Sequence, residues 1–204
     1  MSAMKPIVHP VDVRLNGIVM QCLHETLATM MVNNGNTVRY TSEAVPETGK
    51  AIHAMWEQAK LGITPFRVLN SANEPENLYF NPQVNLLYRA VHDIDHALWY
   101  SAGKGTTKFE HELFLNCLMA KRVYDWCMQD AYYTEQDALL AFFAVYHDTV
   151  GQVYYYKEHG DFVVDQRANT VELMNDCKGV WATKHGMLRI AYTVMRSCLK
   201  ECGL

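Results

Sequence analysis

The stretch NPQVNLLYRAVHDIDHALWY, residues 81–100, decides the fold. Asn81 is a favourable N-cap and Pro82 suits the first helical position, so the stretch predicts a helix from about residue 82 to residue 100. Most of its circumference is apolar, which is typical of a helix buried on several sides. The exceptions are polar residues that share one arc of the helix: Arg89, His92, Asp93 and His96. A buried helix with such a strip is expected to line a cleft.

Apolar spacing and capping signals predict further helices on both sides of this one. Thr107 and Thr134 each open a capping box. The expected helices cover about 12–33, 52–59, a segment that begins at 107, 134–160, 163–177 and 183–201. The prediction is therefore an all-α protein, in which residues 1–204 form a single compact helical domain of about seven helices.

Two segments lack a helical pattern. Within residues 34–46, Thr37 to Thr41 alternates as a strand does but stands alone, so we expect an extended arm or a short hairpin. Residues 63–82 are rich in proline and asparagine, which predicts a long loop. Loops of this length in compact domains are often functional, and this one leads directly into the polar helix.

Composition excludes several classes of protein. Half of the residues are hydrophobic and the formal net charge is −4, which favours a large core and disfavours an extended nucleic-acid surface. The longest apolar run, Ala138 to Tyr146, is too short to span a membrane. Residues 1–12 contain no apolar stretch of signal-peptide length, and the cysteines form no repeating frame. We therefore expect a cytoplasmic protein with no membrane segment and with reduced thiols; a homo-oligomer remains open.

The polar strip itself allows two interpretations. Imidazole and carboxylate groups one turn apart can hold a divalent cation between them. Alternatively, the strip is a solvated face on which Asp93 contacts Arg89 one turn away. Helical geometry does not decide between the two.

The segment His92-Asp93-Ile94-Asp95-His96 resembles the HDxxH signature of the HD-domain superfamily of metal-dependent phosphohydrolases. Its HDxDH form is similar to that of cyclic-nucleotide phosphodiesterases. The resemblance covers about one helix. It implies an HD-domain-like all-α fold, a divalent ion (Mn, Mg, Co, Ni, Zn or Fe) and a small phosphorylated substrate such as a nucleotide. It also implies a ligand set formed by an upstream histidine, the His-Asp doublet and a downstream aspartate.

We assign the downstream ligand to Asp148, because it lies in a helix that is apolar all round, where an ionised carboxylate requires a partner. The upstream ligand is less constrained: His53 is the first choice and His24 the rival. The expected metal ligands are therefore His53, His92, Asp93 and Asp148.

For the implied reaction, His96 is the expected proton donor to the leaving oxygen. Arg89 or Lys104 is expected to stabilise charge on the phosphoryl oxygens. If a second metal is present, as the resemblance allows, its candidate ligands are His96, His111 and Glu112.

Two other classes of function fit the same residues. One is a di-iron oxygenase, on an HD scaffold or as a ferritin-like bundle in which Asp93-x-x-His96 replaces the usual Glu-x-x-His. The other is a non-catalytic helical interaction protein with a solvated polar strip.

Overall fold

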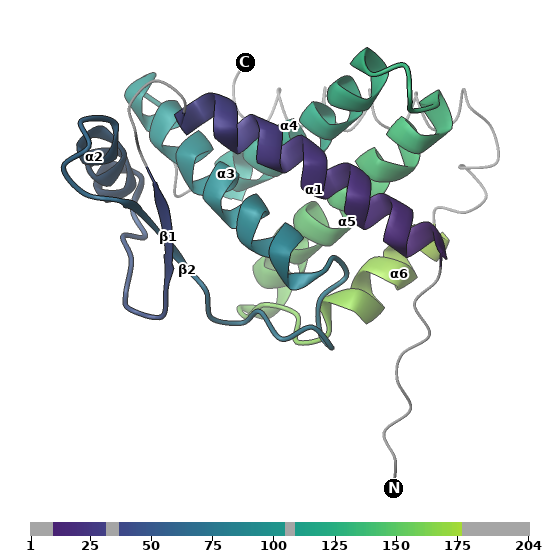
Figure 1. Cartoon of the computed structure of the whole chain (residues 1–204). Helices are drawn as coiled ribbons and strands as arrows, with labels where there is room; N and C mark the ends of the chain where they lie inside the picture. The colour runs from purple at the N-terminus through teal and green to yellow at the C-terminus, as the bar shows by residue number, and fades with distance from the viewer. Residues whose placement is uncertain (1–9, 32–36, 105–108, 177–204) are drawn as a thin grey trace, which may run out of the picture.

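The computed structural model describes residues 10–31, 37–104 and 109–176, and within them it contains six helices and one pair of strands (Figure 1). In chain order these are α1 (Pro10–Met31), β1 (Val38–Thr41), α2 (Gly49–Lys60), β2 (Phe66–Leu69), α3 (Pro82–Ser101), α4 (Phe109–Gln129), α5 (Glu135–His159) and α6 (Gln166–Asp176). The predicted mostly all-α compact domain is confirmed.

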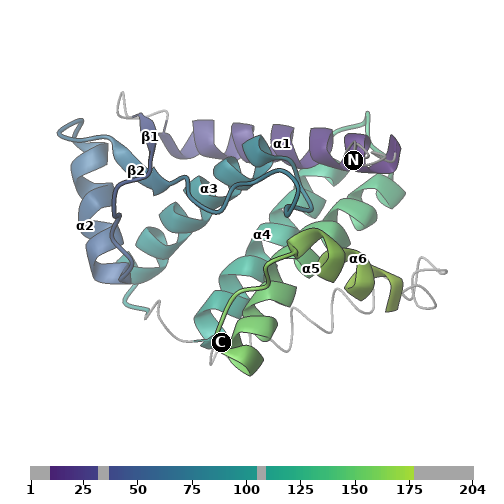
Figure 2. The same cartoon turned by 90° about the horizontal axis from the view of Figure 1, so that it is seen from below.

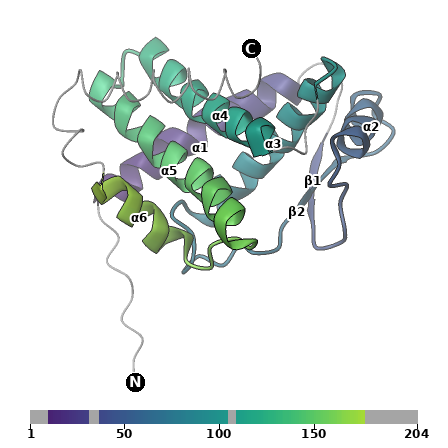
Figure 3. The same ribbon diagram turned by 180° about the vertical axis from the view of Figure 1, so that it is seen from behind.

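The helices form two connected groups. The helices α4 and α5 pack along each other, and α6 lies against α5, as the view from below shows (Figure 2). On the other side α3 packs against both α1 and α2, while the two strands lie beside α2 at one end of the molecule (Figure 3). Two helices connect the groups: α1 contacts both α4 and α5, and α3 contacts α4.

Local sequence explains where the helices begin and end. Asn81 caps α3, since its side chain accepts a hydrogen bond from the backbone N–H of Val84, and Pro82 occupies the first turn. Thr134 and Asp137 form a complete capping box at the start of α5. Gly160 ends α5 with a φ of 76°, in the left-handed region that favours glycine.

The strand pair corrects two predictions. Val38 to Thr41 is neither an isolated arm nor half of a hairpin, because it pairs in parallel with Phe66 to Leu69. The expected loop 63–82 therefore begins with a strand. Parallel strands need a crossover connection, and α2 supplies it. The buried side chains of Phe66 and Val68 do alternate with Arg67. A run of four residues flanked by prolines and asparagines is, however, too short to predict a strand from sequence.

The predicted helices agree closely with α1, α2, α3, α5 and α6. The expected fourth helix is α4, which starts at Phe109 where the described residues resume after 104. The expected helix 183–201 lies outside the described residues. No helix in the described ranges is long and apolar enough to cross a membrane.

The start of α5 allows a test of stability and its pH dependence. The Asp137 carboxylate accepts two hydrogen bonds from Arg14 of α1, at 2.7 and 2.8 Å, and also accepts from the backbone N–H of Thr134. These contacts hold the pKa of Asp137 below its ordinary value, with the Arg14 hydrogen bond as the main cause. We expect Asp137→Asn to lower the free energy of unfolding by about 1 kcal/mol at pH 7.

The sign of the pH effect follows from the lowered pKa. The stabilisation is complete above the ordinary carboxyl pKa and is lost as the pH falls towards the lower pKa of the folded state. The difference between wild type and Asp137→Asn, measured by urea unfolding, should therefore shrink below about pH 4. Glu172→Gln, an exposed change on α6, serves as the control. A constant difference from pH 7 to pH 3 would contradict the assignment.

Candidate metal centre

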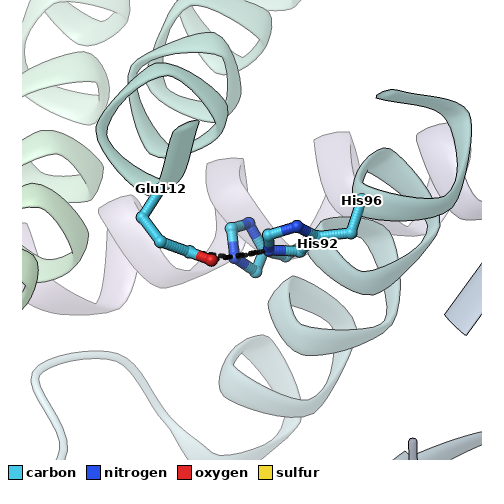
Figure 4. Close-up of side chains that lie close together, drawn as sticks. All are labelled: His92, His96 and Glu112. Atoms are coloured by element: carbon cyan, nitrogen blue, oxygen red, sulfur yellow. Dashed lines mark hydrogen bonds and ion pairs between the residues drawn. The ribbon is translucent and has the colours of Figure 1, made fainter. Parts of the chain in front are cut away.

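Two histidines of α3 and one glutamate of α4 point toward one another (Figure 4). The Nε2 atoms of His92 and His96 are 3.0 Å apart. Glu112 reaches both rings, with Oε2 at 3.2 Å from Nε2 of His92 and Oε1 at 3.2 Å from Nε2 of His96. The two histidines are one turn apart on α3 and therefore share a face, and the third group comes from α4.

The spacing of these three groups fits a metal ion. Nitrogen and oxygen ligands bind ions such as zinc at about 2.0–2.2 Å, which places neighbouring ligand atoms roughly 2.8–3.6 Å from one another for angles at the metal between about 90° and 110°. The three separations here, 3.0, 3.2 and 3.2 Å, lie in that range. The group of His92, His96 and Glu112 can hold a metal ion.

Protons alone satisfy the three contacts poorly. Each Nε2 carries either a hydrogen or a lone pair, and the carboxylate of Glu112 presents lone pairs to both rings. If both rings carry the hydrogen, each can donate to one oxygen of Glu112, but the two N–H groups then lie side by side with their nitrogens only 3.0 Å apart. If one ring lacks the hydrogen, its lone pair faces the oxygens of Glu112. Otherwise it must accept the hydrogen of the other ring, which is then shared with Glu112. A single cation between the three atoms would interact favourably with all of them.

The charges of Glu112 and the two histidines shift the pKa values within the group. Burial by itself would raise the pKa of Glu112, but the hydrogen bonds and charges of His92 and His96 hold it well below its usual range. Burial disfavours the charged form of His92, yet the hydrogen bond and charge of Glu112 raise its pKa above the ordinary value. The carboxylate is therefore ionised at neutral pH and available to a cation.

Packing fixes the orientation of the rings. Tyr88, one turn before His92, stacks on the His92 ring with the centroids 5.4 Å apart. The Tyr88 hydroxyl donates to Oδ1 of Asn116, whose Nδ2 donates to the backbone carbonyl of Glu112 at 2.8 Å. The Nδ1 atoms of both histidines are buried without a hydrogen-bond partner among the described residues. The ring positions thus depend on the helix and its neighbours rather than on a second hydrogen bond.

A pocket of about 300 Å³ opens beside the group. His92 and Glu112 form part of its wall, and Asp148 of α5 lies in the same wall. Burial raises the pKa of Asp148 to about 7, opposed by a hydrogen bond from Thr170 at 3.2 Å. A ligand in the pocket would therefore meet both the metal-binding group and a second, separate carboxyl group.

The structure brings together only part of the expected ligand set. His92 is in the three-residue group, whereas Asp93, His53 and Asp148 are not. His53 instead contacts the ring of Tyr100, at 5.5 Å between centroids, and lies 3.9 Å from Glu57. The rival His24 lines a different surface pocket, beside α1. Neither upstream histidine is placed to complete the group.

Asp93 lies beside the group without joining it. Successive residues of a helix point about 100° apart, so Asp93 is directed away from the shared face of His92 and His96. Burial raises the pKa of Asp93 to about 6, while the charges of His92, His96 and Arg89 act in the opposite direction. Its charge interacts with the group although its oxygens are not ligands in this geometry.

Of the second-metal candidates, His96 and Glu112 join His92 in one group, whereas His111 does not. The His111 ring faces Trp99, with the centroids 6.2 Å apart. Glu112 was expected only as a secondary ligand because nothing in the sequence shows that α4 crosses α3 at this point. His96, expected as a proton donor, directs its Nε2 into the metal-binding group instead.

The two expected cations have other positions. The Arg89 guanidinium donates to the backbone carbonyls of Leu69, Ser71 and Ala72, at 3.1, 2.6 and 3.1 Å. It therefore holds the chain after β2 against α3, where Ala72 adopts a φ of 49°. Lys104 is exposed beyond the end of α3 and does not line the pocket. Neither cation is free in the pocket to bind a phosphoryl group.

Asp95, the second aspartate of the HDxDH segment, has a structural partner. It is 5% exposed and accepts two hydrogen bonds from Arg122 of α4, at 2.8 and 2.9 Å. The sequence did not single out Arg122 as a neighbour of the site, and it did not predict the contacts that Tyr88 and Asn116 make. Their contacts depend on the crossing of α3 and α4.

Fold and site together define a mostly α-helical domain with a two-histidine, one-carboxylate group beside a pocket. The chain matches no protein-family model, no curated protein and no solved structure.

The ion pair between Asp95 and Arg122 can be tested by mutation. Removing one partner leaves the other charge poorly compensated, so we expect Asp95→Ala to lower the free energy of unfolding by about 2–3 kcal/mol. Adding Arg122→Leu to Asp95→Ala should recover part of that loss, as measured by chemical denaturation. If the losses of unfolding free energy caused by the two substitutions simply add, Asp95 and Arg122 do not stabilise each other.

Proposed function

We propose that this chain is a divalent-metal-dependent hydrolase whose ion is held by His92, His96 and Glu112. The convergence of two imidazole nitrogens and one carboxylate within 3.2 Å of one another is the observation that carries the proposal. Two histidines and one glutamate are the protein ligands of several catalytic zinc sites, which keep a further position for water or substrate. The pocket lies on the side where that position would be needed, because His92 and Glu112 line it.

The residues of the chain have separate tasks in this proposal. His92 and His96 bind through Nε2, and Glu112 adds the negative charge that favours a divalent ion over a proton. Tyr88 and Asn116 keep the ligands in place through the stacked ring and the hydrogen bond to the backbone of Glu112. A divalent ion bound there would lower the pKa of water and polarise a substrate oxygen.

The expected substrate is a small phosphoester, such as a nucleotide. The resemblance of residues 92–96 to the HDxDH signature supports this class, and the pocket volume of about 300 Å³ suits a small molecule. Since neither Arg89 nor Lys104 is free to bind the phosphoryl group, its negative charge would be met mainly by the metal ion.

A mononuclear iron oxygenase is the second candidate. Two histidines and one carboxylate on one face of the ion are also the ligands of non-haem Fe(II) oxygenases. The di-iron form receives less support, since the described residues contain a single group of three metal-binding side chains.

Metal content tests the proposed site. Wild-type protein should bind about one equivalent of a divalent ion and release phosphate from a phosphoester such as p-nitrophenyl phosphate. Loss of supporting residues alone costs metal sites about 10–100-fold in affinity, so His92→Ala, which removes a ligand, should lose at least that much. The matched control is His53→Ala, which removes a histidine outside the group. Equal metal loss in both variants would refute the assignment.

Metal identity separates the classes of function. Zinc, manganese, magnesium, cobalt or nickel with phosphate release supports the hydrolase, while iron with oxygen consumption supports the oxygenase. Wild-type protein that binds no stoichiometric metal would contradict both enzymes and leave the non-catalytic interaction protein.

A further inference from the structure

Asp148 places a carboxyl group in the pocket, and no described residue forms an ion pair with it. Its Oδ1 accepts a hydrogen bond from the Thr170 hydroxyl at 3.2 Å. Within the described parts of the chain, no hydrogen bond or ion pair reaches Oδ2. Burying a carboxylate that lacks a cation is costly, and such groups are often found at binding sites.

Neighbouring groups also present hydrogen-bond acceptors. Gln152 lies one turn after Asp148 on α5 and lines the same pocket. Its Nε2 donates to the backbone carbonyl of Asp148 at 2.8 Å, which fixes the amide, and no described residue donates to its Oε1. Phe162, 57% exposed, adds an aromatic surface to the pocket wall.

The described residues of the pocket wall supply no free cation to balance Asp148. Arg89 is the one lysine or arginine among the described residues that line the pocket, and its guanidinium donates to three backbone carbonyls. Asp148 also lies outside the group that can bind a metal ion, and the described residues place no second such group around it. No described residue therefore supplies Asp148 with a positive partner, and a ligand that enters the pocket can supply one.

We propose that the Asp148 end of the pocket binds a cationic, N–H-rich group of the substrate, such as an amine, amidine or guanidine. Asp148 accepts its hydrogen bonds through Oδ2, Gln152 through Oε1, and Phe162 contacts the adjoining apolar part. The inference rests on the proposed function only in placing the reacting bond at the metal-binding group. It narrows the substrate to a molecule with a cationic group at the end remote from the reacting bond.

Benzamidine and benzamide provide a matched pair of probes. They have nearly the same shape, but benzamidine carries a cationic amidinium that can donate two hydrogen bonds to a carboxylate. We would measure both affinities by calorimetry at pH 8 with the whole chain of residues 1–204 after incubation with zinc. Wild type is expected to bind benzamidine at least about 10-fold more tightly than benzamide.

Two variants show whether Asp148 is responsible. Asp148→Asn preserves the volume of the side chain and should weaken benzamidine binding by at least about 10-fold, with little effect on benzamide. Its metal content should equal that of wild type, because Asp148 lies outside the three-residue group. Glu158→Gln removes an exposed charge from the same helix and should change neither affinity.

Equal binding of the two probes by wild type would overturn the proposal, and this comparison requires no variant to fold. Unchanged benzamidine affinity in folded Asp148→Asn would overturn it as well. Metal analysis of the same samples separates the two hypotheses: selective benzamidine binding by a protein without stoichiometric metal would support the amine subsite and refute the hydrolase.

Discussion

Burial of α3 on most of its sides is the constraint on which the remaining structure depends. Helix α3 contributes Val84 and Val91 to the core formed with α1, α4 and α5. It contributes Ala90 and Ile94 to a second core formed with α2 and β2. The apolar faces of α3 are buried in these two cores. The polar residues occupy the remaining arc of the helix, which faces a neighbouring helix or the pocket. The position of the site follows from this division of the α3 surface.

Polar contacts then set how the neighbouring elements approach α3. Arg89 binds the carbonyls that follow β2 and so attaches the strand pair and its connection to the helix. Asp95 binds Arg122 and so joins α3 to α4. Of the other polar side chains on this arc, Arg89 thus joins neighbouring elements to α3, and Asp93 contributes charge beside the histidines. The HDxDH segment would group residues 92–96 as one catalytic set, but in the folded chain Asp95 and the two histidines have different partners.

The contrast between prediction and structure follows from the range of the interactions involved. Helix positions could be predicted because caps such as Asn81 and Thr134 and the apolar spacing act within one or two turns. The partnership of His92 with Glu112 could not, because it depends on how two helices cross. The same limit applies to β2, whose parallel partner lies more than a helix away in sequence. His53 was a reasonable ligand by spacing alone, but spacing does not specify which face of α2 approaches α3.

The group that can hold a metal ion draws its side chains from two helices, so binding of an ion there would depend on the tertiary structure. His92 and His96 lie one turn apart on α3, whereas Glu112 reaches them only when α4 is docked. An ion that needs all three therefore binds the folded state in preference to the unfolded one and stabilises it. The ion pair between Asp95 and Arg122 joins the same helices without a metal. By holding α3 beside α4, it would lower the cost of ordering the three side chains around an ion.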